Sequence, residues 1–404
     1  MLAPDLRDGG HRGVIDGATL ERLRADTPGC PNVAHFNNAG AALPPRPVLA
    51  AQVRHLELEA AIGGYEAAER AEGAVERAYD AIAELLNCSR DEVAVVENAT
   101  RAWDMAFYAL PFAAGDRILT GMNEYASNYL AFLQVARRTG AIIDVVPDEE
   151  HGQLDVAALE RMIDGRVKLI AITHAPTNGG LLNPAAAVGR VARAAGIPYL
   201  LDACQSAGQI PLDVEAIGCD MLSATGRKYL RGPRGIGFLY VRRGLLERLE
   251  PPFLDLHAAT WTGRDTYEVR PDARRFENWE GNVAAKVGLG VAVDYALGIG
   301  LEAIHGRVRD LAELLRARLR EAGADVHDRG AEQSGIVSFT LPGRSPAEIK
   351  TALAERGINV STTTARSTRL DMEARGLSEM VRASVHYYNT AEEVERLVGA
   401  LVHA

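Results

Sequence analysis

Short apolar segments alternate with longer amphipathic segments through the middle of this chain, and this pattern constrains the fold more than any other feature. The apolar segments have the length of buried strands, and they are Val93–Val96, Arg117–Thr120, Ile142–Val146, Leu169–Thr173, Tyr199–Asp202, Met221–Ala224 and Gly237–Val241. Helical segments lie between most of them, for example Ala126–Thr139 and Ala185–Ala195. This alternation predicts a mainly parallel sheet with helices on both faces. Only a short loop precedes Gly235–Val241, which predicts one antiparallel neighbour.

The pattern changes after about Asn282. A long helical region is expected to about Ala322, and strand-like and helical segments then alternate in an α+β arrangement. These segments are strand-like Gly335–Leu341, a helix at Pro346–Arg356, strand-like Ile358–Ser361 and Val381–Ser384, and a last helix at Ala391–Val402. A chain of 404 residues is long enough for two domains. We predict an irregular N-terminal arm over residues 1–30, a large domain over 31–285 and a small C-terminal domain over 286–404.

The charge balance limits the partners that this chain can bind. Its net charge is −10 at pH 7, and its pI is near 5.6. We therefore expect no broad basic face for nucleic acid or for an anionic membrane. Any anion must be bound locally, by helix N-termini and a few arginines. The most apolar stretch, Val287–Leu301, is interrupted by Asp294 and is too short to span a bilayer.

The N-terminal segment and the cysteines predict the compartment. The first ten residues contain no apolar signal region, so secretion is not supported. The four cysteines show neither CxxC spacing nor a metal-ligand pattern with histidine, and they are Cys30, Cys88, Cys204 and Cys219. We interpret them as reduced, partly buried thiols, and we expect a cytoplasmic protein without a metal site. The absence of HExxH, Walker and GxSxG motifs argues against metalloprotease, NTPase and hydrolase mechanisms.

Lys228 lies in the most informative segment, residues 223–237, after the end of a predicted buried strand and among hydroxyl and glycine residues. A lysine is seldom buried without a partner, and a lysine that forms a Schiff base must be held where its amine can lose its proton. The glycines would let the backbone approach a flat ligand closely. The alternative is a surface turn with a solvated basic cluster, made of Arg227, Lys228, Arg231 and Arg234. The segment alone leaves both interpretations open.

Asp202 lies at the carboxyl end of the preceding predicted strand. Ligands bind at this end of the strands in open α/β sheets. Opposite a pyridine nitrogen, the carboxylate would keep the ring protonated and preserve the electron sink of pyridoxal phosphate (PLP). An aspartate that caps a helix or ends a strand in a turn is the commoner alternative. An aspartate on one strand end and a lysine on the next together match the pair that PLP requires.

Two further segments fit this cofactor. Glu97–Arg101 joins a strand to an amphipathic helix, so its backbone N–H groups and the Thr100 hydroxyl would face an anion at a helix N-terminus. Ala99, Thr100 and Arg101 are therefore candidate cofactor contacts, and simple N-capping by Thr100 is the alternative. Tyr125 follows another strand and would lie near the same edge of the sheet. Its ring could stack on a planar cofactor, and routine aromatic packing is the alternative.

From about Phe36 to the C-terminus, the chain resembles the class V aminotransferase family of fold-type-I PLP enzymes, which includes cysteine desulfurases and isopenicillin N epimerase-like proteins. The motifs occur in the family's order, and they are Asn38–Gly40, Ala99–Thr100, Glu124–Tyr125, Thr173–Thr177, Asp202–Gln205, Thr225–Lys228 and Val381–Ser384. The resemblance implies an aspartate-aminotransferase-like α/β fold, with a large domain on a mainly parallel sheet and a smaller α+β C-terminal domain. It also implies pyridoxal 5'-phosphate as the cofactor and an amino acid as the small-molecule substrate.

The resemblance implies roles around the cofactor. Lys228 resembles the Schiff-base lysine, the catalytic residue, and Asp202 resembles the partner of the pyridine nitrogen. Gln205 is expected to contact the phenolic oxygen or the phosphate, and Tyr125 takes the place of the ring-stacking residue. The residues that resemble the phosphate contacts are Thr100, Thr225 and Arg227.

Three further positions follow from the same resemblance. Thr177 is a candidate cofactor contact, but desulfurases carry an asparagine there beside the phenolic oxygen. Arg382 resembles the arginine that grips the substrate carboxylate, a bidentate task suited to its planar guanidinium. A surface arginine on a strand of the small domain is the alternative. Asn38, in the first of the shared motifs, is a further candidate for substrate binding.

The departures from the family narrow the function. Cysteine desulfurases need a nucleophilic cysteine on a loop before the carboxylate-binding arginine, and residues 361–371 contain none. This argues against desulfuration through a persulfide. Residues 381–390, with Asn359–Ser361, resemble ergothioneine-pathway C–S lyases and related lincosamide-pathway enzymes. We predict β-elimination from an S-substituted cysteine or its sulfoxide. Transamination, epimerisation and decarboxylating deamination share every cofactor residue and remain alternatives, and a non-catalytic PLP-fold binding module is a third hypothesis.

The resemblance also implies an assembly. Fold-type-I enzymes usually build each active site at a dimer interface, with phosphate contacts from the neighbouring subunit. Residues 275–282 could supply such a contact. We therefore expect a homodimer with shared active sites, and no nucleic-acid or membrane partner.

Overall fold

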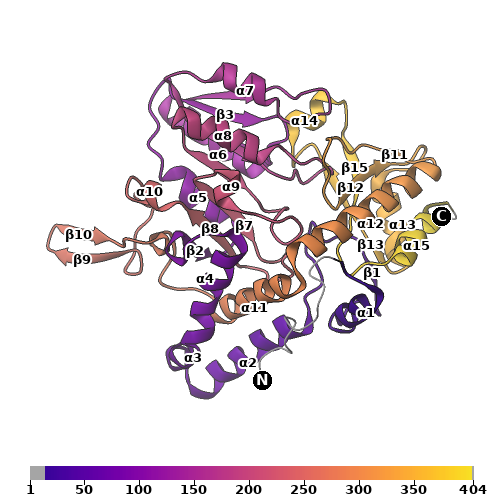
Figure 1. Cartoon of the computed structure of the whole chain (residues 1–404), viewed down its shortest axis with the longest axis horizontal. Coiled ribbons are helices and arrows are strands. Elements are labelled where there is room, and N and C mark those ends of the chain that lie inside the picture. Colours follow the sequence, from indigo (N-terminus) through magenta and orange to yellow (C-terminus); the bar gives the residue numbers. More distant parts are fainter. Residues whose placement is uncertain (1–13, 403–404) are drawn as a thin grey trace.

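A seven-stranded sheet dominates the computed structural model, which describes residues 14–402 (Figure 1). The strand order is β2-β8-β7-β6-β5-β3-β4. The strands are β2 (Val93–Val96), β3 (Arg117–Gly121), β4 (Ile142–Val146), β5 (Val167–Thr173), β6 (Tyr199–Asp202), β7 (Met221–Thr225) and β8 (Gly237–Val241). The strands from β7 to β4 pair in parallel, whereas β8 is antiparallel to both β7 and β2. The predicted mainly parallel sheet and its antiparallel neighbour are confirmed.

Helices cover both faces of this sheet because successive side chains of each strand point to opposite faces. In β8, for example, Phe238 joins one apolar cluster and Leu239 joins the other. Helices that pack into the first cluster include α4 (Glu72–Leu86), α8 (Ala185–Ala195) and α11 (Val283–Ile299). Helices that pack into the second cluster include α5 (Ala99–Tyr108) and α6 (Ala126–Thr139). The other helices of this part are α2 (Arg46–Ile62), α3 (Gly64–Arg70), α7 (Val156–Met162), α9 (Val214–Ile217) and α10 (Arg243–Leu246).

The C-terminal part forms a second, antiparallel sheet with the strand order β11-β12-β15-β14. Its strands are β11 (Asp325–Val326), β12 (Ile336–Thr340), β14 (Ser361–Thr364) and β15 (Glu379–Ser384). Its helices are α12 (Leu301–Glu321), α13 (Pro346–Glu355), α14 (Arg369–Ala374) and α15 (Ala391–Val402). A short parallel pair joins β1 (Ala34–His35) to β13 (Ile358–Asn359). The α+β arrangement follows the prediction, whereas the domain boundaries stay a prediction.

Gly300 breaks the long helical region that was expected up to Ala322. Its φ of 96° lies in the range that favours glycine, and α11 and α12 are bent by 80° at this point. Among residues 14–402, no single helix has the length and apolarity to cross a membrane, whereas this bent pair meets that criterion by length and composition alone.

Two elements are not part of the predicted pattern. The first is a helix within the N-terminal arm, which was expected to be irregular. Residues 1–13 of the arm lie outside the described part, but α1 (Gly17–Ala25) is a helix whose N-cap, Asp16, accepts from the Thr19 amide. It buries Leu23 completely, and Arg24 donates to the Tyr388 carbonyl at 2.7 Å. The second element is a hairpin of β9 (Ala259–Gly263) and β10 (Thr266–Val269), which projects at the left of Figure 1.

Candidate active site

The carboxyl ends of β5, β6 and β7 bring the predicted chemical groups together. The register of the parallel strands pairs Thr173 with Asp202 and Asp202 with Ser223, so these strand ends are level. Lys228 follows β7, and its Nζ lies 3.3 Å from Cys204 Sγ, two residues after Asp202. Asp202 is 6% exposed and interacts electrostatically with Lys228. The structure thus places the predicted lysine and aspartate at one edge of the sheet.

The segment around Lys228 is not a solvated basic turn. Arg231, which belongs to the alternative cluster, is 1% exposed. Its guanidinium donates to the Leu43 carbonyl at 2.8 Å and to two hydroxyl oxygens at 2.6 Å, those of Thr27 and Tyr387. Lys228 and Arg227 are themselves half-buried. Of the four residues of the alternative cluster only Arg234 is exposed, so the surface-turn interpretation of this segment is wrong.

Both carboxylate oxygens of Asp202 accept a hydrogen bond. Oδ1 accepts from the Cys204 amide at 2.8 Å, and Oδ2 accepts from Asn128 Nδ2 at 2.9 Å. Burial raises the pKa of Asp202, while the two donors and the nearby Lys228 act in the opposite direction. A carboxylate offers about four lone-pair sites, so acceptor capacity remains for a further N–H donor.

Glu124 is a second buried carboxyl group in this region, 4% exposed. Its Oε1 accepts from Thr173 Oγ1 at 2.7 Å, from Asn128 Nδ2 at 2.8 Å and from the Tyr125 amide at 2.9 Å. Burial raises the pKa of Glu124 to about 7, and the negative charge of Asp202 adds to this effect, although the donors oppose it. The sequence alone indicates no role for Glu124 or Asn128, since a spacing of four residues does not show what their side chains contact.

The raised pKa of Glu124 predicts how stability depends on pH. In the cofactor-free protein, Glu124 stabilises the fold in its protonated form. This contribution is fully present below the unfolded-state pKa of about 4.3, and it is lost as the pH rises through the folded-state pKa of about 7. Glu124→Gln removes this titration but keeps an acceptor oxygen, so we expect the variant to gain stability relative to wild type between pH 5 and about pH 7. Urea unfolding across this range checks the result, and a constant difference between the two proteins would contradict it.

Gln205, Thr177 and Arg382 form a connected polar group near the Lys228 edge. Gln205 Nε2 donates to Thr177 Oγ1 at 3.1 Å, and an Arg382 Nη donates to the same oxygen at 2.7 Å. Arg382 is 8% exposed, which excludes the surface-arginine alternative, and burial lowers its pKa. Among the described residues, Gln205 Oε1 and Arg382 Nε are buried without a hydrogen-bond partner. Such groups are costly unless a ligand or water satisfies them.

The position of Asn38 does not support the predicted contact with substrate. Its side chain is fully buried, and its amide nitrogen donates to the carbonyl oxygens of Ser384 at 2.7 Å and His35 at 3.1 Å. Its Oδ1 accepts from the Tyr388 hydroxyl. The neighbouring residue faces the site instead, since Asn37 Oδ1 lies 3.5 Å from an Arg382 Nη. The sequence alone could not distinguish these two asparagines.

The residues that are predicted to bind an anion lie where α5 begins, beside β8. A Cβ on Gly237 would lie 3.0 Å from the Ala99 amide nitrogen, so only glycine permits this close approach. Asn98 caps α5 by accepting from the Arg101 amide at 2.9 Å, which leaves the exposed Thr100 hydroxyl free of the capping role that was its alternative. Thr225, which pairs with Gly237, is buried at the end of β7.

Tyr125 and Arg227 complete the set of predicted residues. Tyr125 is 36% exposed and precedes α6, and its amide lies 3.3 Å from Thr173 Oγ1, which places it at the same sheet edge. Arg227 donates to the Gly40 carbonyl, so its guanidinium faces the segment that carries Asn37. Arg382 also interacts electrostatically with both residues. The predicted set thus gathers at one edge, except for the Asn38 side chain.

The chemical groups of these residues match the groups that PLP needs for binding. The site offers a lysine amine, a carboxylate with spare acceptor capacity, a helix N-terminus and two buried polar atoms that have no partner among residues 14–402. These are the groups that an aldehyde, a pyridine nitrogen, a phosphate and a phenolic oxygen require.

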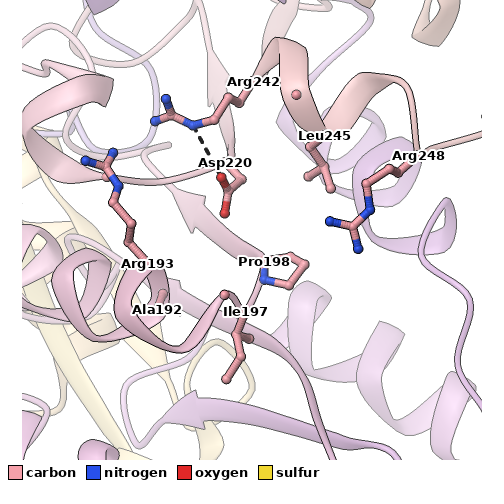
Figure 2. Close-up of a pocket in the computed structure, with 11 residues that line it drawn as sticks. Ala192, Arg193, Ile197, Pro198, Asp220, Arg242, Leu245 and Arg248 are labelled. Carbon is pink, nitrogen blue, oxygen red and sulfur yellow. Dashed lines mark ion pairs between the residues drawn. The ribbon is translucent and has the colours of Figure 1, made fainter.

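A separate cavity of about 200 Å³ lies near the opposite edge of the sheet (Figure 2). Pro198, which precedes β6, and Arg242, which follows β8, contribute to its lining. Asp220 and Arg242 form an ion pair there, with 3.3 Å between Arg242 Nε and Asp220 Oδ1. Since Pro198 precedes the same strand that ends at Asp202, this cavity is not part of the candidate active site.

Comparison with known proteins identifies the family. The model of the class V aminotransferase family matches residues 34–397. A probable cysteine desulfurase from Xylella fastidiosa (strain 9a5c) is 33% identical, covering 95% of this chain and 94% of its own. One from Pyrococcus abyssi is 28% identical, covering 94% and 96%. The apo structure of cysteine desulfurase from Thermococcus onnurineus NA1 superposes with a TM-score of 0.88 at 27% identity, covering 95% and 97%.

These matches extend over nearly the whole chain and confirm the predicted fold, the PLP cofactor and the prediction of an enzyme. A solved cystine C–S lyase, bound to its product cysteine persulfide, has a TM-score of 0.84 at 23% identity and shares the fold, covering 93% of this chain and 99% of its own. The chain belongs to the class V aminotransferase family of fold-type-I PLP enzymes.

Proposed function

We propose that this enzyme is a C–S lyase that cleaves an S-substituted cysteine, or its sulfoxide, into pyruvate, ammonia and a sulfur product. The observation that carries the proposal is the composition of the segment beside the site. The Ala126 amide donates to the Ser367 carbonyl at 2.9 Å, so residues 364–368 lie against the residue that follows Tyr125. No cysteine occurs from 361 to 371, and a desulfurase needs its nucleophilic thiol there.

Lys228 and Asp202 are proposed to act on the cofactor. Lys228 would hold PLP through a covalent bond to its Nζ, and once the substrate amine had displaced it, the freed Lys228 amine would act as the general base at the Cα proton. Asp202 binds the pyridine nitrogen with the acceptor capacity that Asn128 and Cys204 leave free. PLP supplies the protonated ring that takes up the electron pair from Cα when the proton leaves. The electron pair from Cα would then form a double bond to Cβ as the sulfur substituent leaves with the electron pair of the C–S bond, and hydrolysis would yield pyruvate and ammonia.

The other predicted residues hold the cofactor and the substrate. Arg382 is proposed to bind the substrate carboxylate, and this role is supported by its buried Nε, to which the part of the chain described by the structure offers no partner. Gln205 and Thr177 are proposed to contact the phenolic oxygen: Thr177 Oγ1 accepts from Gln205 Nε2 at 3.1 Å, so the Thr177 hydroxyl hydrogen remains to be donated. Tyr125 stacks on the ring. The residues proposed for the phosphate are Ala99, Thr100, Arg101, Thr225 and Arg227.

Pyruvate release without a keto-acid acceptor tests this function. The PLP-loaded protein is assayed with a panel of cysteine S-conjugates and their sulfoxides, and catalytic pyruvate with ammonia supports a C–S lyase. An aldehyde or keto product without pyruvate would move the assignment to deamination or transamination, which share every cofactor residue. Absence of any turnover across the panel would favour the binding-module hypothesis. The resemblance of residues 381–390 to ergothioneine-pathway lyases places the sulfoxides first in the panel.

We also propose that the enzyme is a cytoplasmic homodimer whose partner subunit completes the phosphate site. Large apolar side chains are exposed close together in sequence from 253 to 279, and they are Phe253, Leu254, Leu256, Trp261, Tyr267 and Trp279. The Arg101 guanidinium lies over the Phe253 ring at 5.7 Å, so this surface begins beside the N-terminus of α5. A second copy that covers the surface would therefore reach the proposed phosphate contacts. The predicted contact segment, residues 275–282, lies in the same region.

Substitutions on this surface are expected to change the oligomeric state. Leu256 and Trp261 are 74% and 75% exposed, so the double variant Leu256→Ser/Trp261→Ser is expected to fold but to shift the protein toward monomer. Light scattering at several concentrations measures the mass, and PLP affinity is expected to fall together with dimerisation. The control, Val14→Ser, changes a residue that is 77% exposed outside this region and should keep the wild-type mass. A wild-type protein that is monomeric with full activity would contradict the proposal.

A further inference from the structure

Asn128 is a buried amide that bridges two carboxyl groups. It lies on α6 and is 3% exposed. Its Nδ2 donates to Asp202 Oδ2 at 2.9 Å and to Glu124 Oε1 at 2.8 Å. Both acceptors are carboxylate oxygens, so the amide must present its NH₂ group and not its carbonyl oxygen to them. The two hydrogens of one nitrogen thereby fix the direction of two carboxyl groups.

Glu124 is itself held from three sides. Thr173 at the end of β5 donates to Oε1, and Thr120 in β3 donates to Oε2 at 3.0 Å. The Tyr125 amide donates to Oε1 as well. The orientation of Asn128 is therefore transmitted from two strands of the central sheet through Glu124 to Asp202.

We propose that Glu124 and Asn128 are positioning residues that aim a free lone pair of Asp202 at the pyridine nitrogen of PLP. The proposal rests on the role proposed for Asp202. Without Asn128, Oδ2 would lose the donor that the described residues give it. The carboxylate could then turn about its terminal torsion, because of the described donors only the Cys204 amide would hold it. A misdirected carboxylate makes a poorer hydrogen bond to the pyridine N–H.

Matched variants test the positioning through cofactor binding and spectrum as well as turnover. Asn128→Leu removes both donors at similar size, and Glu124→Leu removes the acceptor that orients Asn128. Both are expected to weaken PLP binding about tenfold or more. They are also expected to move the pH midpoint of the absorption change of lysine-bound PLP in the same direction as Asp202→Asn does. Glu124→Gln keeps an acceptor oxygen and should restore both properties to near wild type. PLP is added back to the stripped full-length protein, and its binding is measured by equilibrium dialysis and absorbance.

The outcomes separate this inference from the proposed function. If Asp202→Asn leaves the affinity and the pH midpoint at wild-type values, the role proposed for Asp202 fails. If Asp202→Asn alters them while Asn128→Leu does not, the role of Asp202 stands and the positioning by Asn128 is refuted. Asn128→Ala replaces Asn128→Leu if the leucine variant does not fold, as judged by thermal unfolding of the cofactor-free protein. If Glu124→Gln lowered PLP affinity and shifted the pH midpoint as much as Glu124→Leu, the positioning role proposed for Glu124 would be refuted.

Discussion

Replacing Lys228 with alanine is expected to abolish catalytic pyruvate release. The side chain has two tasks in the proposed mechanism, since it holds PLP covalently and removes the Cα proton. A positioned general base contributes about 10²- to 10⁴-fold to a rate, so the turnover number should fall by about 10³-fold or more. Borohydride reduction should fix PLP to the wild-type chain but not to the variant, and intact-protein mass spectrometry measures the adduct.

A lysine elsewhere on the sheet provides the control for this substitution. Lys168 lies on β5, but its side chain is exposed. Lys168→Ala should therefore keep wild-type turnover and the reducible PLP adduct. If Lys228→Ala released pyruvate at the wild-type rate, the proposed mechanism would be refuted. Retention of the adduct without turnover would show that another lysine carries the cofactor.

The sequence predicts that Asp202, at the end of β6, and Lys228, shortly after β7, share one edge of the sheet. This prediction is possible because the positions of both residues depend on regular structure. Parallel strands end at the same edge of a sheet, so the apolar periodicity that locates the strands also locates the residues that follow them. The observed register of Thr173 with Asp202 has this origin. The fold class and the cofactor are for the same reason readable from pattern and motif.

Side-chain direction could not be predicted in the same way. Asn37 and Asn38 are adjacent in sequence, and only the packing of Tyr388 and Ser384 determines that Asn38 turns inward. The bond between Asn128 and Asp202 joins residues that are 74 positions apart. Such contacts depend on how a helix lies on its sheet, and apolar periodicity carries no information about them.

Local sequence pattern does not predict helix α1 or the hairpin of β9 and β10, for related reasons. One side chain of α1, that of Leu23, is buried, so the helix lacks a broad apolar face and depends on contacts with the C-terminal part. The side chains of the hairpin from 260 to 268 are exposed, so burial leaves no alternation to detect there. Local pattern predicts an element only where one face of that element is buried.

The second large effect is expected on stability, from the buried ion pair between Arg316 and Asp328. The two side chains are 3% and 0% exposed, and Arg316 Nε lies 2.7 Å from Asp328 Oδ2. Asp328 Oδ1 also accepts from the Gly180 amide at 3.1 Å and the Ser338 amide at 3.0 Å. Asp328→Ala would leave a buried guanidinium without its counter-ion, so we expect the free energy of unfolding to fall by about 3–5 kcal/mol.

Urea unfolding of single and double variants distinguishes the free energy lost when one partner is removed from the net contribution of the pair to stability. Arg316→Met/Asp328→Leu replaces both charges with apolar groups and should recover most of the loss, because an isolated buried charge costs more than the pair contributes. The exposed pair of Arg318 and Glu321 has the same 2.7 Å distance, and its side chains are 42% and 61% exposed. Glu321→Ala should therefore cost at most about 1 kcal/mol. Equal losses for Asp328→Ala and Glu321→Ala would contradict this account, since burial is what separates the two pairs.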